Sequence, residues 1–470
     1  MNRTLLGIAL SLALSGCANF APDFLRPAAP IPTEWPASAA PVGQGKSLAE
    51  TGWQDFFADA RLKQVVDLAL RNNRDLRVAV LNIEKARAQY QIGDAARYPA
   101  INASAADNVQ RLPDVLSAGG KGQVTRQYSV GIGFSGYELD FFGRVANLKD
   151  QALEQFLATE EARRSAHISL VAEVANTWLA LAADQERLQL ARETLTSQQS
   201  SLSMTQRSFD VGVSTALDLN QSRMAVESAK ADVARFTASV AQDRNALNLV
   251  VGSTTPDDLL PAKLTEMASA MNEIPAGVPS ETLLQRPDIA QAERLLRAAN
   301  ANIGAARAAF YPRIVLTASG GVASNRLSNL FDGGTGTWSF LPQIVLPIFN
   351  AGANQANLDA AQADQKIRIA QYEKAIQGAF REASDALAVR ATVGDQMAAQ
   401  QALVAAAAES YRLSDLRYRT GVDSYLPVLD SQRSHYAAQQ GLITVKQAQQ
   451  GNVVSLYKVF GGGWQEKTGG

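Results

Sequence analysis

The chain has 470 residues, a formal net charge of −1 and a sequence pI of about 6.3. This balance argues against a nucleic-acid binder, which would usually carry a basic excess. Hydrophobic residues make up 46% and aromatic residues 7%, so much of the apolar content is Ala, Leu and Val, as in closely packed long helices. Two His and one Cys leave little material for a metal site, and no catalytic triad or phosphate loop stands out. We therefore predict that the protein is not an enzyme and binds no metal or cofactor.

The N-terminus has the pattern of a secretory signal peptide. Arg3 supplies a positive charge, and residues 5–14 form an apolar stretch that is too short to span a membrane as a mature helix. The sequence Leu-Ser-Gly-Cys that follows resembles the bacterial lipobox, which is cleaved just before the cysteine. We therefore expect Cys17 to carry diacylglycerol and an N-terminal acyl chain. Ala18 stands where many inner-membrane lipoproteins have Asp, which implies sorting to the outer membrane.

A segment rich in Pro and Ala, residues 21–47, follows the cysteine and is predicted to be an extended tether on the surface. Beyond the signal peptide the sequence has no apolar run of about 18 residues, so we predict no mature transmembrane helix.

Two segments with helical spacing indicate an internal repeat. Residues 62–97 end before Pro99 and residues 282–310 end before Pro312, because a residue that precedes proline is pushed toward extended backbone. The interval between the two prolines equals the interval between Asp75 and Asp288. A constant offset of this kind is typical of a duplicated structural unit.

After each Tyr-Pro pair the apolar period changes from that of a helix to that of a strand. Segments of about ten residues that alternate between apolar and small or polar side chains are typical of transmembrane barrel strands. The four candidates are residues 101–110, 128–135, 314–320 and 337–346. Four strands cannot close a barrel, and open edges in a bilayer leave backbone groups unpaired. The sequence permits two chains with eight strands or three chains with twelve.

Long helices make up the remainder. Residues 142–211 contain no proline and only one glycine, enough for a helix of roughly 100 Å. Apolar residues recur there every seven positions, which favours coiled-coil packing. The series is Val174, Leu181, Leu188, Leu195, Leu202 and Phe209, then Leu219, Val226, Val233, Val240 and Leu247, with Met397, Val404, Tyr411 and Tyr418 in the second repeat.

The predicted organisation follows from these patterns. It is a signal peptide (1–16), a lipidated tether (17–50), a first repeat (51–252, strand hairpin about 100–140, helical tip near 212), a linker with four prolines (253–280), a second repeat (281–461, strand hairpin about 313–348, helical tip near 421) and a C-terminal tail (462–470). The fold class is mixed α and β, dominated by long coiled-coil hairpins.

Several motifs resemble those of the outer-membrane factor, or TolC-like, channels, and within them the NodT-type efflux lipoproteins. They are the stretches 284–289 (LQRPDI), 298–304 (AANANIG), 308–312 (AAFYP), 137–144 (YELDFFGR), 346–352 (LPIFNAG) and 417–433. The likeness covers essentially the whole mature chain.

The resemblance implies a homotrimer in the outer membrane of a Gram-negative bacterium. Each chain would contribute four strands to a twelve-stranded barrel, and the long helices would form an α-barrel in the periplasm. The role implied is a passive exit duct for drugs and small toxic compounds, joined to a periplasmic adaptor and an inner-membrane pump of the resistance-nodulation-division type. Two alternatives stay open: an exit duct for secreted polypeptides and a structural coiled-coil lipoprotein.

The resemblance also points to a periplasmic gate. Asp430 matches the family's constricting aspartate, and Leu426, one helical turn earlier, matches a hydrophobic ring residue. Tyr418 and Arg417 match residues that tie neighbouring coils shut, and Asp218 in the first tip matches a partner of those ties.

The chain departs from some relatives at two positions near this gate. Asp423 stands where those relatives have a basic residue, and Pro427 stands where they have a second acid. The match therefore supports one acidic ring and not two.

Overall fold

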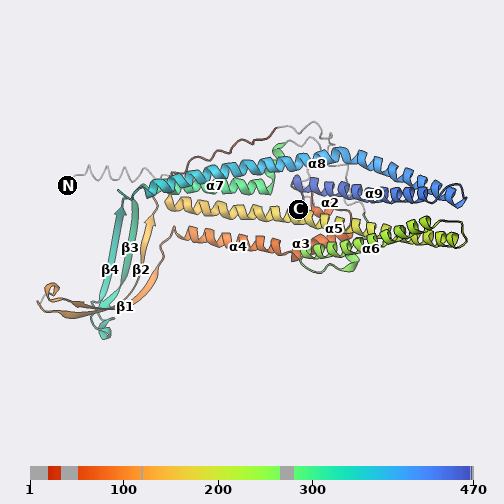
Figure 1. The fold of residues 1–470 in the computed structure, drawn as a ribbon. Coiled ribbons are helices and arrows are strands. Elements are labelled where there is room, and N and C mark those ends of the chain that lie inside the picture. Colours follow the sequence, from red (N-terminus) through yellow and green to blue (C-terminus); the bar gives the residue numbers. More distant parts are fainter. Residues whose placement is uncertain (1–18, 33–50, 118–119, 265–279, 466, 468–470) are drawn as a thin grey trace. The chain divides into compact units, whose positions relative to one another are not determined.

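A computed structural model of the chain describes residues 19–32, 51–117, 120–264, 280–465 and 467 (Figure 1). Cys17, the signal peptide and most of the predicted tether lie outside the described residues. The helices are α2 (Trp53–Phe56), α3 (Ala60–Asn72), α4 (Arg74–Ala95), α5 (Arg144–Asp210), α6 (Ala216–Val251), α7 (Pro287–Ala308), α8 (Ala353–Arg419) and α9 (Leu426–Val459). Short 3-10 helices are η2 (Asp114–Leu116), η3 (Asp257–Leu259), η5 (Ser280–Gln285) and η6 (Leu327–Asn329).

The four predicted strands form one antiparallel sheet in the order β1-β2-β3-β4 (Figure 1). The strands are β1 (Asn102–Leu112), β2 (Gln123–Leu139), β3 (Arg313–Ser324) and β4 (Gly336–Val345). β1 and β2 form the hairpin of the first repeat, β3 and β4 form that of the second, and β2 pairs with β3 across the repeats. The fold class predicted from the alternating and heptad patterns is confirmed.

Two pairs of equivalent helices in the predicted repeats have equal lengths. α4 and α7 each have 22 residues, and α5 and α8 each have 67 residues. The offset in residue number is slightly larger between α4 and α7 than between α5 and α8, so the first strand hairpin is the longer of the two. These two pairs therefore keep the same length, and the difference between them in residue number falls in the strand hairpins; α6 and α9 differ slightly, with 36 and 34 residues.

The predicted helix over residues 62–97 is wrong in one respect, because it is interrupted at Asn73. This residue has extended backbone with ψ of 133°, and its Oδ1 accepts a hydrogen bond from the backbone N–H of Leu76 at 2.8 Å. Its Nδ2 donates to the carbonyl of Val250 at 2.8 Å. Asn73 therefore ends α3 and caps α4, which apolar spacing alone does not indicate.

The chain divides into two compact units whose boundary falls within α4, α5, α7 and α8. Of the described residues, the first comprises 19–28, 82–117, 120–159 and 291–372 and contains the sheet; the second comprises 29–32, 51–81, 160–264, 280–290, 373–465 and 467. Each of these units contains parts of both predicted repeats. The division of the chain into two repeats therefore stays a prediction.

Several large aromatic side chains lie in the core of the second unit. Trp53, Phe57, Trp178 and Tyr457 are all at most 2% exposed. The rings of Phe56 and Tyr457 stack with their centroids 3.8 Å apart. α5 contributes Trp178 to this core and is, by length and composition, the one described helix that could cross a membrane; 61% of its most apolar 18-residue window is buried in the chain, as in a core helix.

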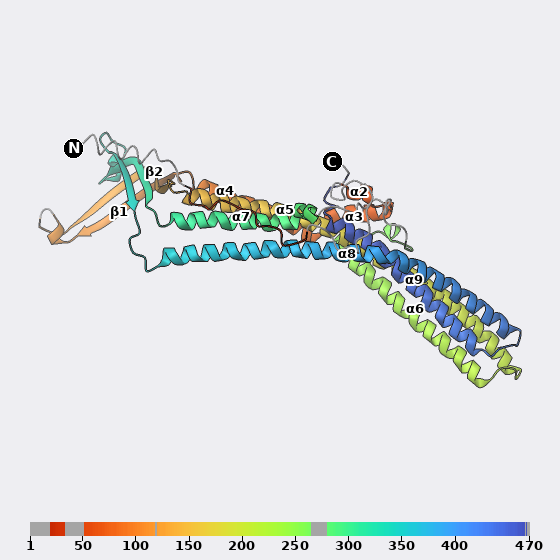
Figure 2. The same cartoon turned by 90° about the horizontal axis from the view of Figure 1, so that it is seen from above.

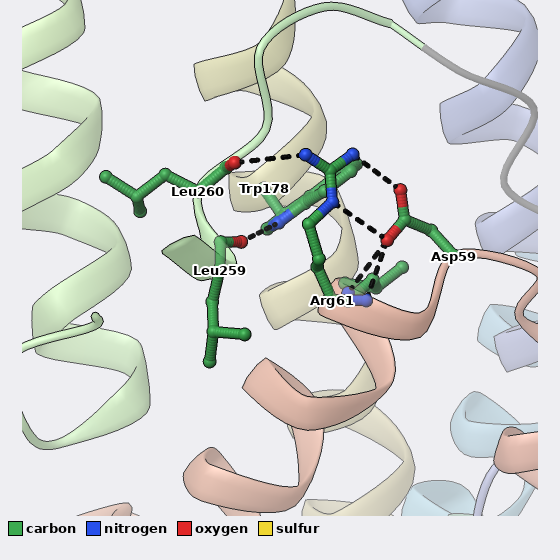
Figure 3. A network of polar contacts seen from close by, with 6 residues as sticks. Asp59, Arg61, Trp178, Leu259 and Leu260 are labelled. Atoms are coloured by element: carbon green, nitrogen blue, oxygen red, sulfur yellow. Dashed lines mark hydrogen bonds and ion pairs between the residues drawn. The ribbon is translucent and has the colours of Figure 1, made fainter. Parts of the chain in front are cut away.

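The described part of the predicted linker packs against α3 and α5 (Figure 3). The carbonyl of Leu259 accepts a hydrogen bond from Trp178 Nε1 at 3.3 Å, and the carbonyl of Leu260 accepts one from Arg61 at 3.4 Å. Asp59 caps α3 and holds Arg61 in an ion pair of 2.9 Å. These contacts make this stretch part of the second unit's packed structure.

Candidate gate at the helical tips

Both helical tips belong to the second unit, and they lie side by side (Figures 1 and 2). The first tip joins α5 to α6 and the second joins α8 to α9. All five predicted gate residues lie at these tips, four of them in the α8–α9 hairpin.

The two turns share a backbone hydrogen bond at equivalent positions. In the first, Gly212 has φ of +77° and the N–H of Val213 donates to the carbonyl of Ser208 at 2.8 Å. In the second, Gly421 has φ of +74° and the N–H of Val422 donates to the carbonyl of Arg417 at 2.9 Å. Glycine is favoured at both turns because this left-handed conformation crowds a Cβ atom.

Asp218 forms a capping box at the start of α6. Its carboxylate accepts hydrogen bonds from the backbone N–H of Thr215 at 3.0 Å and from the Thr215 hydroxyl at 2.7 Å. The hydroxyl in turn accepts from the backbone N–H of Asp218 at 3.1 Å. Within its own chain, Asp218 therefore stabilises the first turn of α6. Its predicted role as a partner of ties between chains stays a prediction.

Arg417 forms a bidentate ion pair with Asp423 across the second turn. Its Nε donates to Asp423 Oδ2 at 2.5 Å, and one terminal nitrogen donates to Oδ1 at 2.9 Å. The hydrogen bond from Arg417 lowers the pKa of Asp423, and the same bond raises the pKa of Arg417. Asp423 is the residue that departs from the family pattern in the sequence, and in the structure it pairs with Arg417.

Tyr418 packs in an apolar cluster that joins the two hairpins. The cluster comprises Ala225 of α6, Tyr425, Val428 and Leu429, with Tyr411 and Tyr418 of α8 packed against it. The ring centroids of Tyr418 and Tyr425 lie 5.1 Å apart. Sequence reasoning missed Tyr425, which is only 2% exposed. Tyr425 lies beyond the end of α8 at Arg419, so the heptad register of that helix does not extend to it.

Leu426 and Asp430 lie on the exposed face of the first turns of α9, away from the apolar cluster that contains Val428 and Leu429. Leu426 is 48% exposed and Asp430 is exposed, whereas Val428 and Leu429 beside them are buried. A residue and its fourth successor share one helical face. The apolar and acidic groups expected to form rings are therefore both available to other molecules.

This site has no metal-binding arrangement of the usual kind. Among residues 19–32, 51–117, 120–264, 280–465 and 467, no group of three or more His, Cys, Asp or Glu side chains could hold a metal ion.

Comparison with known proteins identifies the family. The model described as outer membrane efflux protein matches residues 65–253 and 278–462. The antibiotic efflux pump outer membrane protein ArpC and the toluene efflux pump outer membrane protein TtgC, both of Pseudomonas putida, are each 48% identical over 473 residues, covering 100% of this chain and 97% of each relative. The crystal structure of the open state of the Neisseria gonorrhoeae MtrE outer membrane channel is 37% identical, with a TM-score of 0.87 over 96% of this chain and 100% of that one.

The chain belongs to the outer membrane efflux protein family. It is an efflux component of the outer membrane of a Gram-negative bacterium, as the motifs of the second repeat and the strand-to-helix junctions predicted.

Proposed function

We propose that the chain assembles into a homotrimer that forms the passive exit duct of a tripartite efflux system. The observation that carries this proposal is the open sheet. Within the described residues, β1 pairs only with β2 and β4 only with β3, so both outer edges have unpaired backbone groups. In a bilayer such groups must be satisfied by closure of the barrel. Pairing of β1 with β4 of the next copy closes it, and three copies supply the twelve strands expected of this family.

A periplasmic adaptor and an inner-membrane pump supply the energy and deliver the substrate. The printed names of two relatives refer to antibiotics and to toluene. We infer that this duct likewise releases drugs and small toxic compounds, and that it catalyses no reaction.

The proposed gate consists of rings of Leu426 and Asp430 around the axis of the assembly. Three Leu426 side chains form an apolar constriction that closes by dewetting, and three Asp430 carboxylates repel one another and attract cations. Tyr418, Arg417 and Asp218 stabilise the closed arrangement. Support comes from the exposure of Leu426 and Asp430 on one face of α9.

Conductance of the purified protein in planar lipid bilayers tests this function. Asp430→Ala should raise the single-channel conductance of the closed form, because the shorter side chain widens the constriction and no carboxylate ring is left to hold a cation in it. Asp430→Asn, which keeps the shape of the side chain, separates the effect of charge from that of packing. If neither the wild type nor the Asp430 variants form pores, the proposed function is wrong.

Acylation at Cys17 is a further part of the proposal and rests on the lipobox-like sequence. More than one acyl chain makes such an anchor stable. Cys17→Ser should abolish incorporation of labelled palmitate, while trimers that assemble through barrel and coil contacts should persist.

A further inference from the structure

The two tips share a backbone turn but stabilise the outgoing helix by different side chains. When the turns are aligned on Gly212 and Gly421, Arg417 and Asp423 replace Ser208 and Ser214. In the same alignment Pro427 replaces Asp218. The second tip therefore lacks the carboxylate of the capping box and has an ion pair across the turn instead.

α9 begins without a capping side chain. Its N-cap residue is Tyr425, which has α-helical backbone (φ −73°, ψ −22°) and makes no side-chain capping hydrogen bond. α6, by contrast, has the complete capping box of Thr215 and Asp218. A helix start without such a cap leaves its first backbone N–H groups without a side-chain partner.

The Arg417–Asp423 pair connects the end of α8 to the segment just before α9. Arg417 lies in the last turn of α8, and Asp423 lies shortly before Leu426, the first residue of α9. Two hydrogen bonds of 2.5 and 2.9 Å join the planar guanidinium to the carboxylate, which restrains orientation as well as distance.

We propose that Asp423 is a positioning residue of the gate. Through its bidentate pair with Arg417 it fixes the turn from which α9 departs, and thereby the direction of Leu426 and Asp430. This inference rests on the proposed function as a gated duct. Arg417 consequently acts on the closed state through Asp423 of its own chain, not through a direct tie to a neighbour.

Asp423→Asn should raise the conductance of the closed channel, because the amide cannot reproduce the charge-assisted bidentate pair. A matched control exists nearby, where Arg419 pairs with Asp415 at 2.8 Å within α8. The side-chain exposures match closely: 56% and 29% for Arg417 and Asp423, against 59% and 27% for Arg419 and Asp415. The Asp415 pair does not cross the turn, so Asp415→Asn should leave the conductance unchanged.

A double-mutant cycle tests whether Arg417 and Asp423 act as one unit. If they do, Arg417→Gln, Asp423→Asn and the double variant should raise conductance equally, because either single change already removes the pair. Additive effects of the two changes would overturn the inference, since Arg417 would then have another target.

Asp430→Ala separates this inference from the proposed function. If Asp430→Ala raises conductance and Asp423→Asn does not, the positioning role of Asp423 is wrong and the gate stands. If Asp430→Ala also has no effect, the gate itself is wrong. Light scattering of each detergent-solubilised variant confirms that equal assemblies are compared, and an increase in conductance with assembly intact supports the inference.

Discussion

The two tips show how a duplicated helical hairpin keeps its backbone while its side chains diverge. Gly212 and Gly421 have nearly the same positive φ, and an equivalent backbone hydrogen bond closes each turn. The first tip uses a local capping box, which depends on neutral donors and one carboxylate. The second uses an exposed ion pair, whose strength depends on salt and pH. A shared shape therefore does not imply a shared response to the environment.

The largest expected effect comes from removing the contact that joins the tips. Tyr425→Ala deletes a buried aromatic ring from the cluster with Ala225, Val428 and Leu429, and should cost about 3 kcal/mol or more of local stability. Hydrogen exchange of the amides in the first turns of α9 measures the loss. Tyr425→Phe keeps the ring and should cost about 1 kcal/mol or less. Equal exchange rates in the two variants would contradict the importance of this ring.

A smaller effect is expected from the cap of the first tip. Thr215→Ala removes the capping hydroxyl and should destabilise the start of α6 by about 1 kcal/mol, which increases amide exchange there by roughly fivefold. Ser424→Ala at the equivalent position of the second tip should have no such effect on α9, which has no capping side chain. Similar responses of both helices would remove the distinction between the tips.

Salt should change the amide exchange rates of the two tips differently, with a smaller effect than loss of the cap. Raising the ionic strength from about 0.1 to 1 M shortens the Debye length from about 10 to 3 Å. Exchange at the second turn should accelerate because the exposed Arg417–Asp423 pair is screened, while exchange at the first turn stays nearly constant. In Asp423→Asn the second turn should also become insensitive to salt; a persistent salt response would assign the sensitivity to other charges.

The smallest expected effect is a response to acid at the second tip. Arg417 lowers the pKa of Asp423, so the pair stabilises the turn above the unfolded value of about 3.9. This contribution is lost as the pH falls through the lower folded value. Exchange at the second turn, corrected for the intrinsic pH dependence of exchange, should therefore rise on acidification below about pH 4. Asp423→Asn should show no such rise, and the same rise in this variant would contradict the role of Asp423.

Sequence patterns were sufficient for elements whose period repeats many times. The strands and the paired 67-residue helices follow from alternating and heptad spacing, because each period corresponds to one buried face. The gate residues were placed by motif, and the structure puts Arg417, Tyr418, Leu426 and Asp430 in one hairpin. Tyr425 was not placed by the sequence, because it lies after the turn, where the heptad register of α8 no longer applies.

By itself the sequence determined the strand and helix types and the two glycine turns, because these depend on neighbouring residues and on local backbone sterics. Only the tertiary structure decided the break at Asn73 and the pairing of Arg417 with Asp423. The amide of Asn73 needs the Val250 carbonyl from a distant helix. Arg417 has several carboxylates within reach along the chain, and which one it binds depends on how the turn directs both side chains in space.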